Sequence, residues 1–291
     1  TKALIGYEFQ QRSKLYSLNT FRGSFGYIWK ENIRKEHELK VTEITYASPM
    51  HITSLYESQI AQNDALAKVI EKQLIFGPSY SYTYTNTMEK RRKNTIYFKG
   101  DFETTGTTAG LIFGNNAKKE APKEILGVPF SQYVKLQAEF RYYHKLNQNS
   151  EIASRIIAGG AFAYGNATTI PFIKQFFIGG TNSIRAFRAR SIGPGSSEPD
   201  TNSAFLPDQS GDIKLEFSTE YRAKIYSIVH GAVFLDAGNI WTRNDPDESK
   251  NFSKKFFEEI AVGAGFGLRF DLSILVLRTD FALPLRLPYG N

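Results

Sequence analysis

Three arginines lie within six residues in the segment GGTNSIRAFRARSIGPG, residues 179–195, which begins and ends with glycine. No hydrophobic periodicity runs through this segment, so we expect it to be a loop. Its first arginine, Arg185, stands between Ile184 and Phe187. The strongest partners of a guanidinium are carboxylates, which accept hydrogen bonds from its rigid fork of donors. Taken alone, the segment favours a solvated arginine loop, whereas acidic partners elsewhere in the chain would favour a loop that is held in place.

Other residues that could carry chemistry form no pattern of a catalytic, cofactor or metal site. The chain has no cysteine, which excludes thiol nucleophiles, thiolate metal sites and disulfides. The histidines are scattered, and the G-x-S-x-G motif of serine hydrolases does not occur. The acidic group at 245–248 lies in an expected loop, where a solvated surface is favoured over calcium binding. We therefore expect no enzyme, no cofactor and no metal ion.

The charge balance limits the class of partner. The 291 residues carry a formal net charge of +7, which is compatible with nucleic acid or an anionic membrane surface. Basic residues, however, alternate with acidic ones inside strand-like segments such as KLQAEFRYY, and no basic helix or zinc-ligand spacing occurs. We therefore do not expect nucleic acid as a partner. No apolar run approaches the ~20 residues of a membrane helix, and the first residues do not form a signal peptide.

Alternation of apolar and polar residues is the dominant pattern of the chain. It is clear in residues 134–142, 212–222 and 260–271, where nearly every second residue is apolar and most residues between them are polar, charged or glycine. Such alternation predicts strands with one apolar and one polar face. We predict about eleven strands, many of them long enough to cross a bilayer at a tilt: 2–13, 19–31, 36–48, 73–87, 93–106, 129–144, 151–165, 210–223, 227–241, 257–271 and 273–285.

The connections between these strands are of two kinds. Those after the even-numbered strands are short, whereas those after the odd-numbered strands are mostly long, at 49–72, 107–128, 166–209 and 242–256. Outer-membrane barrels combine short periplasmic turns with long extracellular loops, and a soluble β-sandwich has no reason to do so. The sequence therefore predicts an all-β, transmembrane antiparallel β-barrel, in preference to a soluble all-β fold.

One of the long connections, 49–72, carries a predicted helix over residues 53–73. Ser54 precedes Glu57 at the spacing of a capping box, and a broken apolar stripe follows. We expect this helix to pack over the rim of its own barrel. A lid or a partner-docking helix is the alternative.

Three motifs follow one another in the second half of the chain. The second is L-E-F at 215–217, and the third is F-x-D-x-G-x-x-W at 234–241. In this order the motifs resemble the C-terminal membrane barrel of the BamA/TamA outer-membrane assembly family, and within it the TamL-like proteins of Bacteroidetes. The first motif, G-G-x-x-S-I-R-x-F in the long loop, consists of Gly179, Gly180, Ser183, Ile184, Arg185 and Phe187.

The resemblance implies a sixteen-stranded barrel in the bacterial outer membrane whose lid loop folds inward. In that arrangement Arg185 clasps acidic residues on the inner wall. Glu216 and Asp236 are the expected partners, because both lie on the polar faces of the two strands that follow the loop. In a partly desolvated lumen, loss of one partner would leave a costly unpaired charge.

Small residues in one predicted strand and in the loop affect how closely the loop can approach the barrel wall. Gly263, Gly265 and Gly267 share one face of a predicted strand and do not match the G-x-G-x-x-G of a dinucleotide site. We expect them to leave room for the loop, although easing of barrel curvature explains them equally well. Ala186 stands where the family usually has glycine. Alanine rarely adopts a positive φ, so either the turn does not need one or the loop is remodelled.

The resemblance also implies a function without covalent chemistry. A barrel of this family assists the folding and insertion, or the export, of other outer-membrane proteins. Its partners are the lipid bilayer, unfolded outer-membrane proteins and accessory periplasmic or lipoprotein subunits. A passive pore or a two-partner-type secretion channel is the alternative. Against the family pattern, residues 1–291 form an incomplete barrel domain: the first strands, the periplasmic domains, the last strand and the lateral gate lie outside them.

Overall fold

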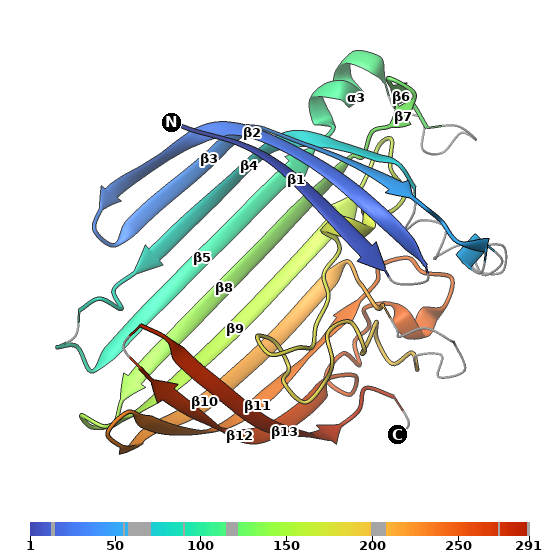
Figure 1. The fold of residues 1–291 in the computed structure, drawn as a ribbon. Coiled ribbons are helices and arrows are strands. Elements are labelled where there is room, and N and C mark those ends of the chain that lie inside the picture. Colours follow the sequence, from blue (N-terminus) through green and yellow to red (C-terminus); the bar gives the residue numbers. More distant parts are fainter. Residues whose placement is uncertain are drawn as a thin grey trace. The chain divides into compact units, whose positions relative to one another are not determined.

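The structure is a computed structural model that describes residues 1–12, 15–54, 56–57, 71–89, 91–114, 122–198, 208–272 and 274–289. Eleven long strands pair in one sheet, in the order in which they occur along the chain (Figure 1). The prediction of about eleven strands is confirmed. The strands are β1 (Lys2–Arg12), β2 (Tyr16–Asn32), β3 (Lys35–Met50), β4 (Gln73–Thr85), β5 (Asn94–Thr105), β8 (Tyr133–Lys145), β9 (Ser150–Ala163), β10 (Ile213–Tyr226), β11 (Val229–Trp241), β12 (Ala261–Asp271) and β13 (Val276–Arg286).

Two of the connections differ from the expectation. Strand β12 begins at Ala261 rather than at residue 257, because the residues before it form turns. The connection 106–132 contains a short helix, α3 (Thr107–Phe113), and the paired strands β6 (Glu124–Ile125) and β7 (Val128–Pro129). Among the described residues, no helix has the length and apolar character needed to cross a membrane.

Most of the helix predicted for residues 53–73 lies outside the described residues. Its first turn is described, and Ser54, Tyr56 and Glu57 are helical there. The hydroxyl of Thr53, rather than that of Ser54, accepts a hydrogen bond from the N–H of Tyr56 at 3.3 Å.

The chain divides into two compact units. The first comprises residues 1–82, 101–136 and 161–175, and the second comprises residues 83–100, 137–160 and 176–291. In the first unit, β1, β2 and β3 form an antiparallel meander. Its buried residues include Ile75, Phe130 and Tyr133.

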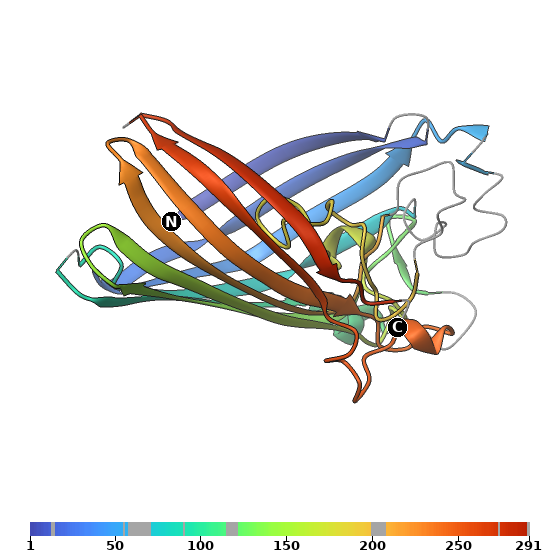
Figure 2. The ribbon, with the colours of Figure 1, turned by 90° about the horizontal axis from the view of Figure 1, so that it is seen from below.

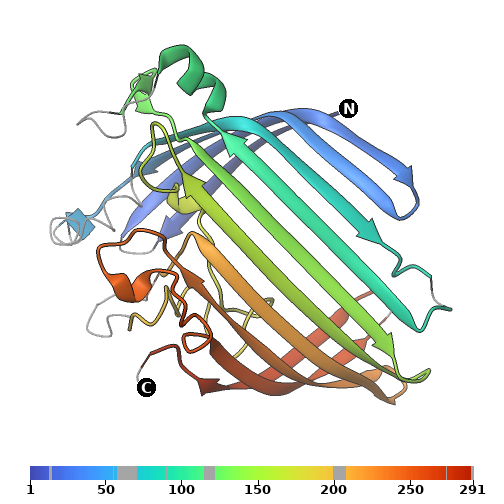
Figure 3. The ribbon, with the colours of Figure 1, turned by 180° about the vertical axis from the view of Figure 1, so that it is seen from behind.

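In the second unit, β9 to β13 pair antiparallel in sequence order. The register places Asp236 of β11 between Ser218 of β10 and Gly263 of β12. Short turns at 227–228 and 272–275 join these strands at one end, where the turn at 146–149 also lies (Figure 3). The long connections, including 242–260, leave from the other end. The polar residues that the alternation placed on one face are therefore aligned across several strands.

The distribution of polar and apolar side chains in the second unit is the reverse of that in a soluble protein. Val233 is 62% exposed and Leu283 is 73% exposed, whereas Asp236 is 0% exposed and Glu220 is 6% exposed. The connection between β9 and β10, residues 164–212, is called the lid loop below. Its segment in the second unit lies against the face of β10 and β11 that bears these carboxylates (Figure 2). The opposite, apolar face is exposed.

Candidate functional site

The lid loop turns sharply at its glycine pair. Gly179 and Gly180 have φ values of 90° and 93°, a backbone conformation that glycine adopts at little cost. The N–H of Gly179 donates to the hydroxyl of Ser183 at 3.1 Å, and the N–H of Gly180 donates to the carbonyl of Phe187 at 2.7 Å. The motif therefore closes on itself and presents the residues between the glycines and Phe187 to the wall.

Apolar side chains anchor this turn on either side of the arginine. Ile184 is fully buried and Phe187 is 9% exposed. The Cδ1 atom of Ile184 lies over Gly238 of β11, 3.3 Å from the position that a Cβ at residue 238 would take. The absence of a side chain at Gly238 thus allows the loop to approach the strand closely.

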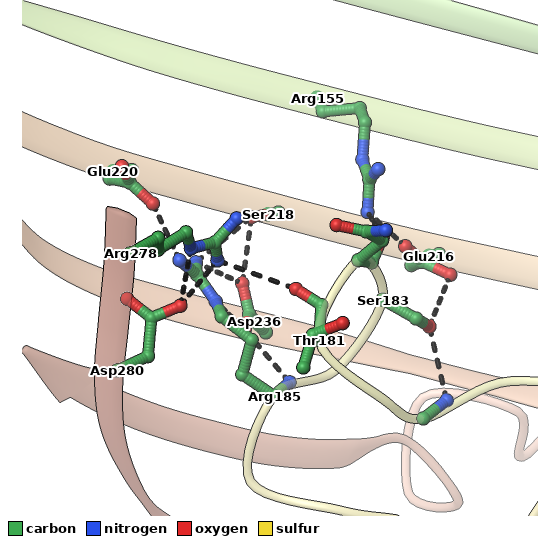
Figure 4. Close-up of polar contacts among 12 residues, drawn as sticks. Arg155, Thr181, Ser183, Arg185, Glu216, Ser218, Glu220, Asp236, Arg278 and Asp280 are labelled. Atoms are coloured by element: carbon green, nitrogen blue, oxygen red, sulfur yellow. Dashed lines mark hydrogen bonds and ion pairs between the residues drawn. The ribbon is translucent and has the colours of Figure 1, made fainter. Parts of the chain in front are cut away.

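Arg185 reaches the inner wall and binds two carboxylates there (Figure 4). Its Nε donates to Oδ2 of Asp236 at 2.7 Å and its Nη2 donates to Oδ1 at 2.8 Å, a bidentate pair. Its Nη1 donates to Oε2 of Glu220 at 2.5 Å. The guanidinium carbon lies 3.3 Å from the centre of the Phe234 ring, which adds a cation–π contact. The backbone N–H of Arg185 also donates to Asp236, at 3.1 Å.

These charges are largely removed from solvent. The side chain of Arg185 is 6% exposed, that of Asp236 is 1% exposed and that of Glu220 is 7% exposed. Burial alone would lower the pKa of Arg185, but its hydrogen bonds to Asp236 and Glu220 outweigh burial and raise the pKa. The guanidinium therefore stays charged. Through Glu220 and Asp236 it joins the loop to both β10 and β11. We call Arg185, Glu220 and Asp236 the clasp.

Glu216, the other carboxylate expected for Arg185, does not contact it. Its carboxylate instead accepts hydrogen bonds from Arg155 of β9 and from the hydroxyl of Ser183, the latter at 2.7 Å. Arg155 also donates to the loop carbonyl of Asn182 at 2.8 Å. Glu216 thus holds the lid loop through Ser183 and Arg155, and Glu220, on the same face of β10, takes the place next to Arg185.

The two other arginines of the segment 179–195, Arg188 and Arg190, have different environments. Arg188 is exposed. The guanidinium of Arg190 lies 4.2 Å from the centre of the Phe177 ring and 3.4 Å from a carboxylate oxygen of Asp208. Only Arg185 of the three reaches the carboxylates of β10 and β11.

The three glycines of β12 face different neighbours. A Cβ at Gly263 would lie 2.5 Å from the Cβ of Ala186, so this glycine gives room to the lid loop. A Cβ at Gly265 would meet the ring of Phe234, and one at Gly267 would meet the side chain of Asp280. Ala186 does not adopt a positive φ, so its turn does not require glycine.

A further network, not anticipated from the sequence, lies in the first unit. Lys174, at the end of a single 3-10 turn in the lid loop (Phe172–Lys174), places its Nζ 2.7 Å from Glu103 of β5 and 3.4 Å from Glu43 of β3. The hydroxyl of Tyr133 donates to the same oxygen of Glu103 at 2.7 Å. Lys40 donates to Glu43 at 2.6 Å. The first part of the lid loop is therefore fastened to the first unit.

Replacing Lys174 with methionine is expected to destabilise the barrel by about 1–3 kcal/mol, because Glu103 would lose its cation at a largely buried position. Glu43 would keep Lys40. Thermal unfolding of the purified barrel, followed by its mobility on a semi-native gel, measures the effect. Lys2→Gln is the control, because the pair of Lys2 with Glu38 is far more exposed and such pairs contribute about 0–1 kcal/mol. Equal losses in both variants would contradict the assignment.

Comparison with known proteins places this geometry in a family. Residues 6–290 match the Omp85 superfamily domain, which is nearly the whole chain. The chain belongs to the Omp85 superfamily. An outer membrane protein assembly factor BamA from Nitratidesulfovibrio vulgaris (strain Hildenborough) is 26% identical over 201 residues, which are 69% of this chain and 22% of that protein.

Solved structures share the fold of this Omp85 chain. BamA from Haemophilus ducreyi, lacking POTRA domains 1–3, matches with a TM-score of 0.63 and 17% identity, over 98% of this chain and 55% of that chain. CdiB from Escherichia coli matches with a TM-score of 0.56 and 14% identity, over 96% of this chain and 45% of that chain. The chain thus spans about a fifth of the curated relative and about half of each solved chain.

Membership in the Omp85 superfamily explains the reversed polarity of the strands. Omp85 proteins are β-barrels of the bacterial outer membrane, so the exposed apolar face of β9 to β13 faces lipid and the carboxylate face lines the lumen. The short turns correspond to the periplasmic end and the long connections to the extracellular end. The lid loop therefore enters the lumen from the extracellular end.

Proposed function

We propose that residues 1–291 belong to the membrane barrel domain of an outer-membrane protein assembly factor, which assists the folding and insertion, or the export, of other outer-membrane proteins. The observation that carries this proposal is the clasp: a loop from the extracellular end is fixed to the lumen wall by a buried arginine on two carboxylates. The curated relative is itself named an assembly factor, which supports the same conclusion.

In the proposed mechanism the chain's residues bind and position, and no bond of the substrate is made or broken. Arg185 joins β10 to β11 and, with Glu216, sets the depth to which the lid loop enters. This side of the barrel is thereby kept rigid and in register. Thinning of the bilayer and opening of the barrel then concentrate at a weaker seam elsewhere in the barrel. The partners of the complete protein are the bilayer, unfolded outer-membrane proteins and accessory periplasmic or lipoprotein subunits.

Replacing Arg185 with alanine in the full-length protein tests this proposal. In cells depleted of the wild-type protein, we expect the amounts of several other outer-membrane proteins to fall severalfold while the variant barrel is still present and folded. The reason is that the lid loop loses its contacts with Asp236 and Glu220 together. Immunoblots of whole membranes give the amounts, and gel mobility before and after heating gives the folded fraction.

The matched control is Arg188→Ala, which removes an exposed arginine three residues away in the same loop. It is expected to support assembly as the wild type does. Unchanged amounts of other outer-membrane proteins in the Arg185→Ala cells would overturn the proposal, and so would an equal defect in both variants.

A secretion channel is the second candidate, because the CdiB barrels have the same fold as this chain. The sequence match to an assembly factor and the higher TM-score against BamA favour assembly. Conductance in planar bilayers separates the two functions. A large and steady current through the reconstituted wild-type protein would favour the channel.

A further inference from the structure

A basic cavity lies in the second unit at the periplasmic end of the lumen, next to the clasp, because Arg222 and Arg269 in its wall both bind Glu220. Its volume is about 890 Å³, which is within the range of cavities that hold ligands. Eight lysines and arginines line it against two carboxylates, a formal balance of +6. The cations come from the turn between β4 and β5 and from β8, β10, β12 and β13. This concentration of positive charge exceeds what the chain needs for its own ion pairs there.

Two groups of cations can be distinguished in the cavity. Arg222 binds Glu151 and Glu220, and Arg278 binds Asp280, so these guanidiniums are already held in place. Lys93 and Lys224, by contrast, are exposed and have no ion pair within the part of the chain that the structure describes. The cavity therefore combines a preorganised positive wall with uncommitted ammonium groups at its entrance.

We propose that this cavity binds an acidic segment of a polypeptide, one that carries several aspartates or glutamates. This inference deepens the proposed function, on which it rests, because the periplasmic end is where an unfolded substrate or an accessory subunit meets the barrel. A carboxylate-rich segment supplies the charges that the cavity lacks, and long-range attraction speeds its capture.

The position of the cavity favours a polypeptide over a lipid headgroup. The cavity opens on the lumen face of the strands, whereas the lipid-facing residues, such as Val233 and Phe266, lie on the other face. A phospholipid bound here would have to leave its acyl chains in a polar lumen, at the cost of exposing apolar surface to water. An extended polypeptide has no such tail.

Fluorescence anisotropy with a labelled glutamate-rich peptide, added to the full-length protein in nanodiscs of zwitterionic lipid, tests the proposal. We expect saturable binding that weakens as salt is raised, and no binding of a lysine-rich peptide of equal length. The double variant Lys93→Gln/Lys224→Gln is expected to weaken binding about tenfold, since each of two exposed ion pairs contributes up to about fivefold in affinity. Its folding should be unaffected, because neither side chain belongs to the clasp.

The control is Lys254→Gln/Lys255→Gln, which removes the same charge from exposed residues of the connection before β12. It is expected to bind the peptide as the wild type does. Equal weakening by the control, equal binding of the lysine-rich peptide, or no binding of the acidic peptide at low salt would overturn the proposal. Competition by inorganic phosphate, or by phosphatidylglycerol in the nanodisc, at constant ionic strength would assign the cavity to a phosphate group instead.

The result separates this proposal from the proposed function. Binding is measured without assembly, so its absence together with a defect of the Arg185→Ala variant in cells would overturn only the acidic-peptide site. Binding together with normal assembly by the Arg185→Ala variant would overturn only the proposed function.

Discussion

Replacing Asp236 with alanine is expected to lower the free energy of unfolding of the barrel by about 3–5 kcal/mol, the usual cost of removing one member of a buried ion pair. Asp236 is fully buried and accepts hydrogen bonds from the side chain and the backbone N–H of Arg185 and from Ser218. Without it, the guanidinium of Arg185 would remain in the wall with Glu220 as its single carboxylate. Chemical unfolding of the refolded barrel, followed by tryptophan fluorescence, gives the free energy.

Two further variants determine whether the loss comes from the unpaired charge. Asp247→Ala removes an aspartate whose side chain is 48% exposed in the 242–260 connection, and it is expected to cost about 1 kcal/mol or less. Arg185→Met combined with Asp236→Leu removes both partners and is expected to recover more than half of the lost stability, because no buried charge is then left unpaired. Assembly of other outer-membrane proteins should stay impaired in the double variant. Wild-type stability in Asp236→Ala would show that the clasp does not hold the barrel.

The strands of this protein are predictable because each one separates two environments. Lipid on one side and the lumen on the other require alternation along the chain, and the alternation is clear in β8, β10 and β12. The start of β12 was placed too early for a physical reason. Ile260 continues the apolar positions of the strand, but the residues before it form turns: the N–H of Glu258 donates to the carbonyl of Lys255 at 2.8 Å, and Phe257 is 68% exposed. Apolar residues of a rim connection resemble those of a strand.

The sequence predicts that Arg185 binds carboxylates of the two following strands, but it identifies only one of the two carboxylates, Asp236, correctly. Alternation places Glu216 and Glu220 on the same face of β10, about 13 Å apart along the strand. The depth to which the lid loop enters decides which carboxylate meets Arg185, and that depth depends on the packing of Ile184 over Gly238.

Arg155, which binds Glu216, could have been predicted from the strand register, since it lies directly across from Ser218 of β10. The role of Lys174 could not have been predicted from the sequence, because its partners Glu43 and Glu103 come from distant strands.

The sequence also left two explanations for the glycines of β12, and one substitution separates them. Gly263→Ala is expected to destabilise the barrel by about 1–3 kcal/mol and to loosen the lid loop, because it overpacks a close contact. The new Cβ would lie 2.5 Å from the Cβ of Ala186, and its next neighbour, a carbonyl oxygen of Leu283, would be 3.6 Å away. Ala186 is therefore the single serious obstacle. Thermal unfolding and the rate at which a protease cleaves the lid loop measure the two effects.

Rescue by a second substitution makes this test specific. Ala186→Gly removes the obstacle, so the double variant Gly263→Ala/Ala186→Gly should regain most of the wild-type stability, less the ~0.5–1 kcal/mol that a flexible glycine costs. The same change should not rescue Gly265→Ala, whose Cβ would meet the Phe234 ring and the backbone of β13. Gly23→Ala is the neutral control, because a Cβ there would have no neighbour within 4 Å. If Gly263→Ala alone were as stable as the wild type, the glycine would serve the curvature of the strand, and Ala186 would not rest on it.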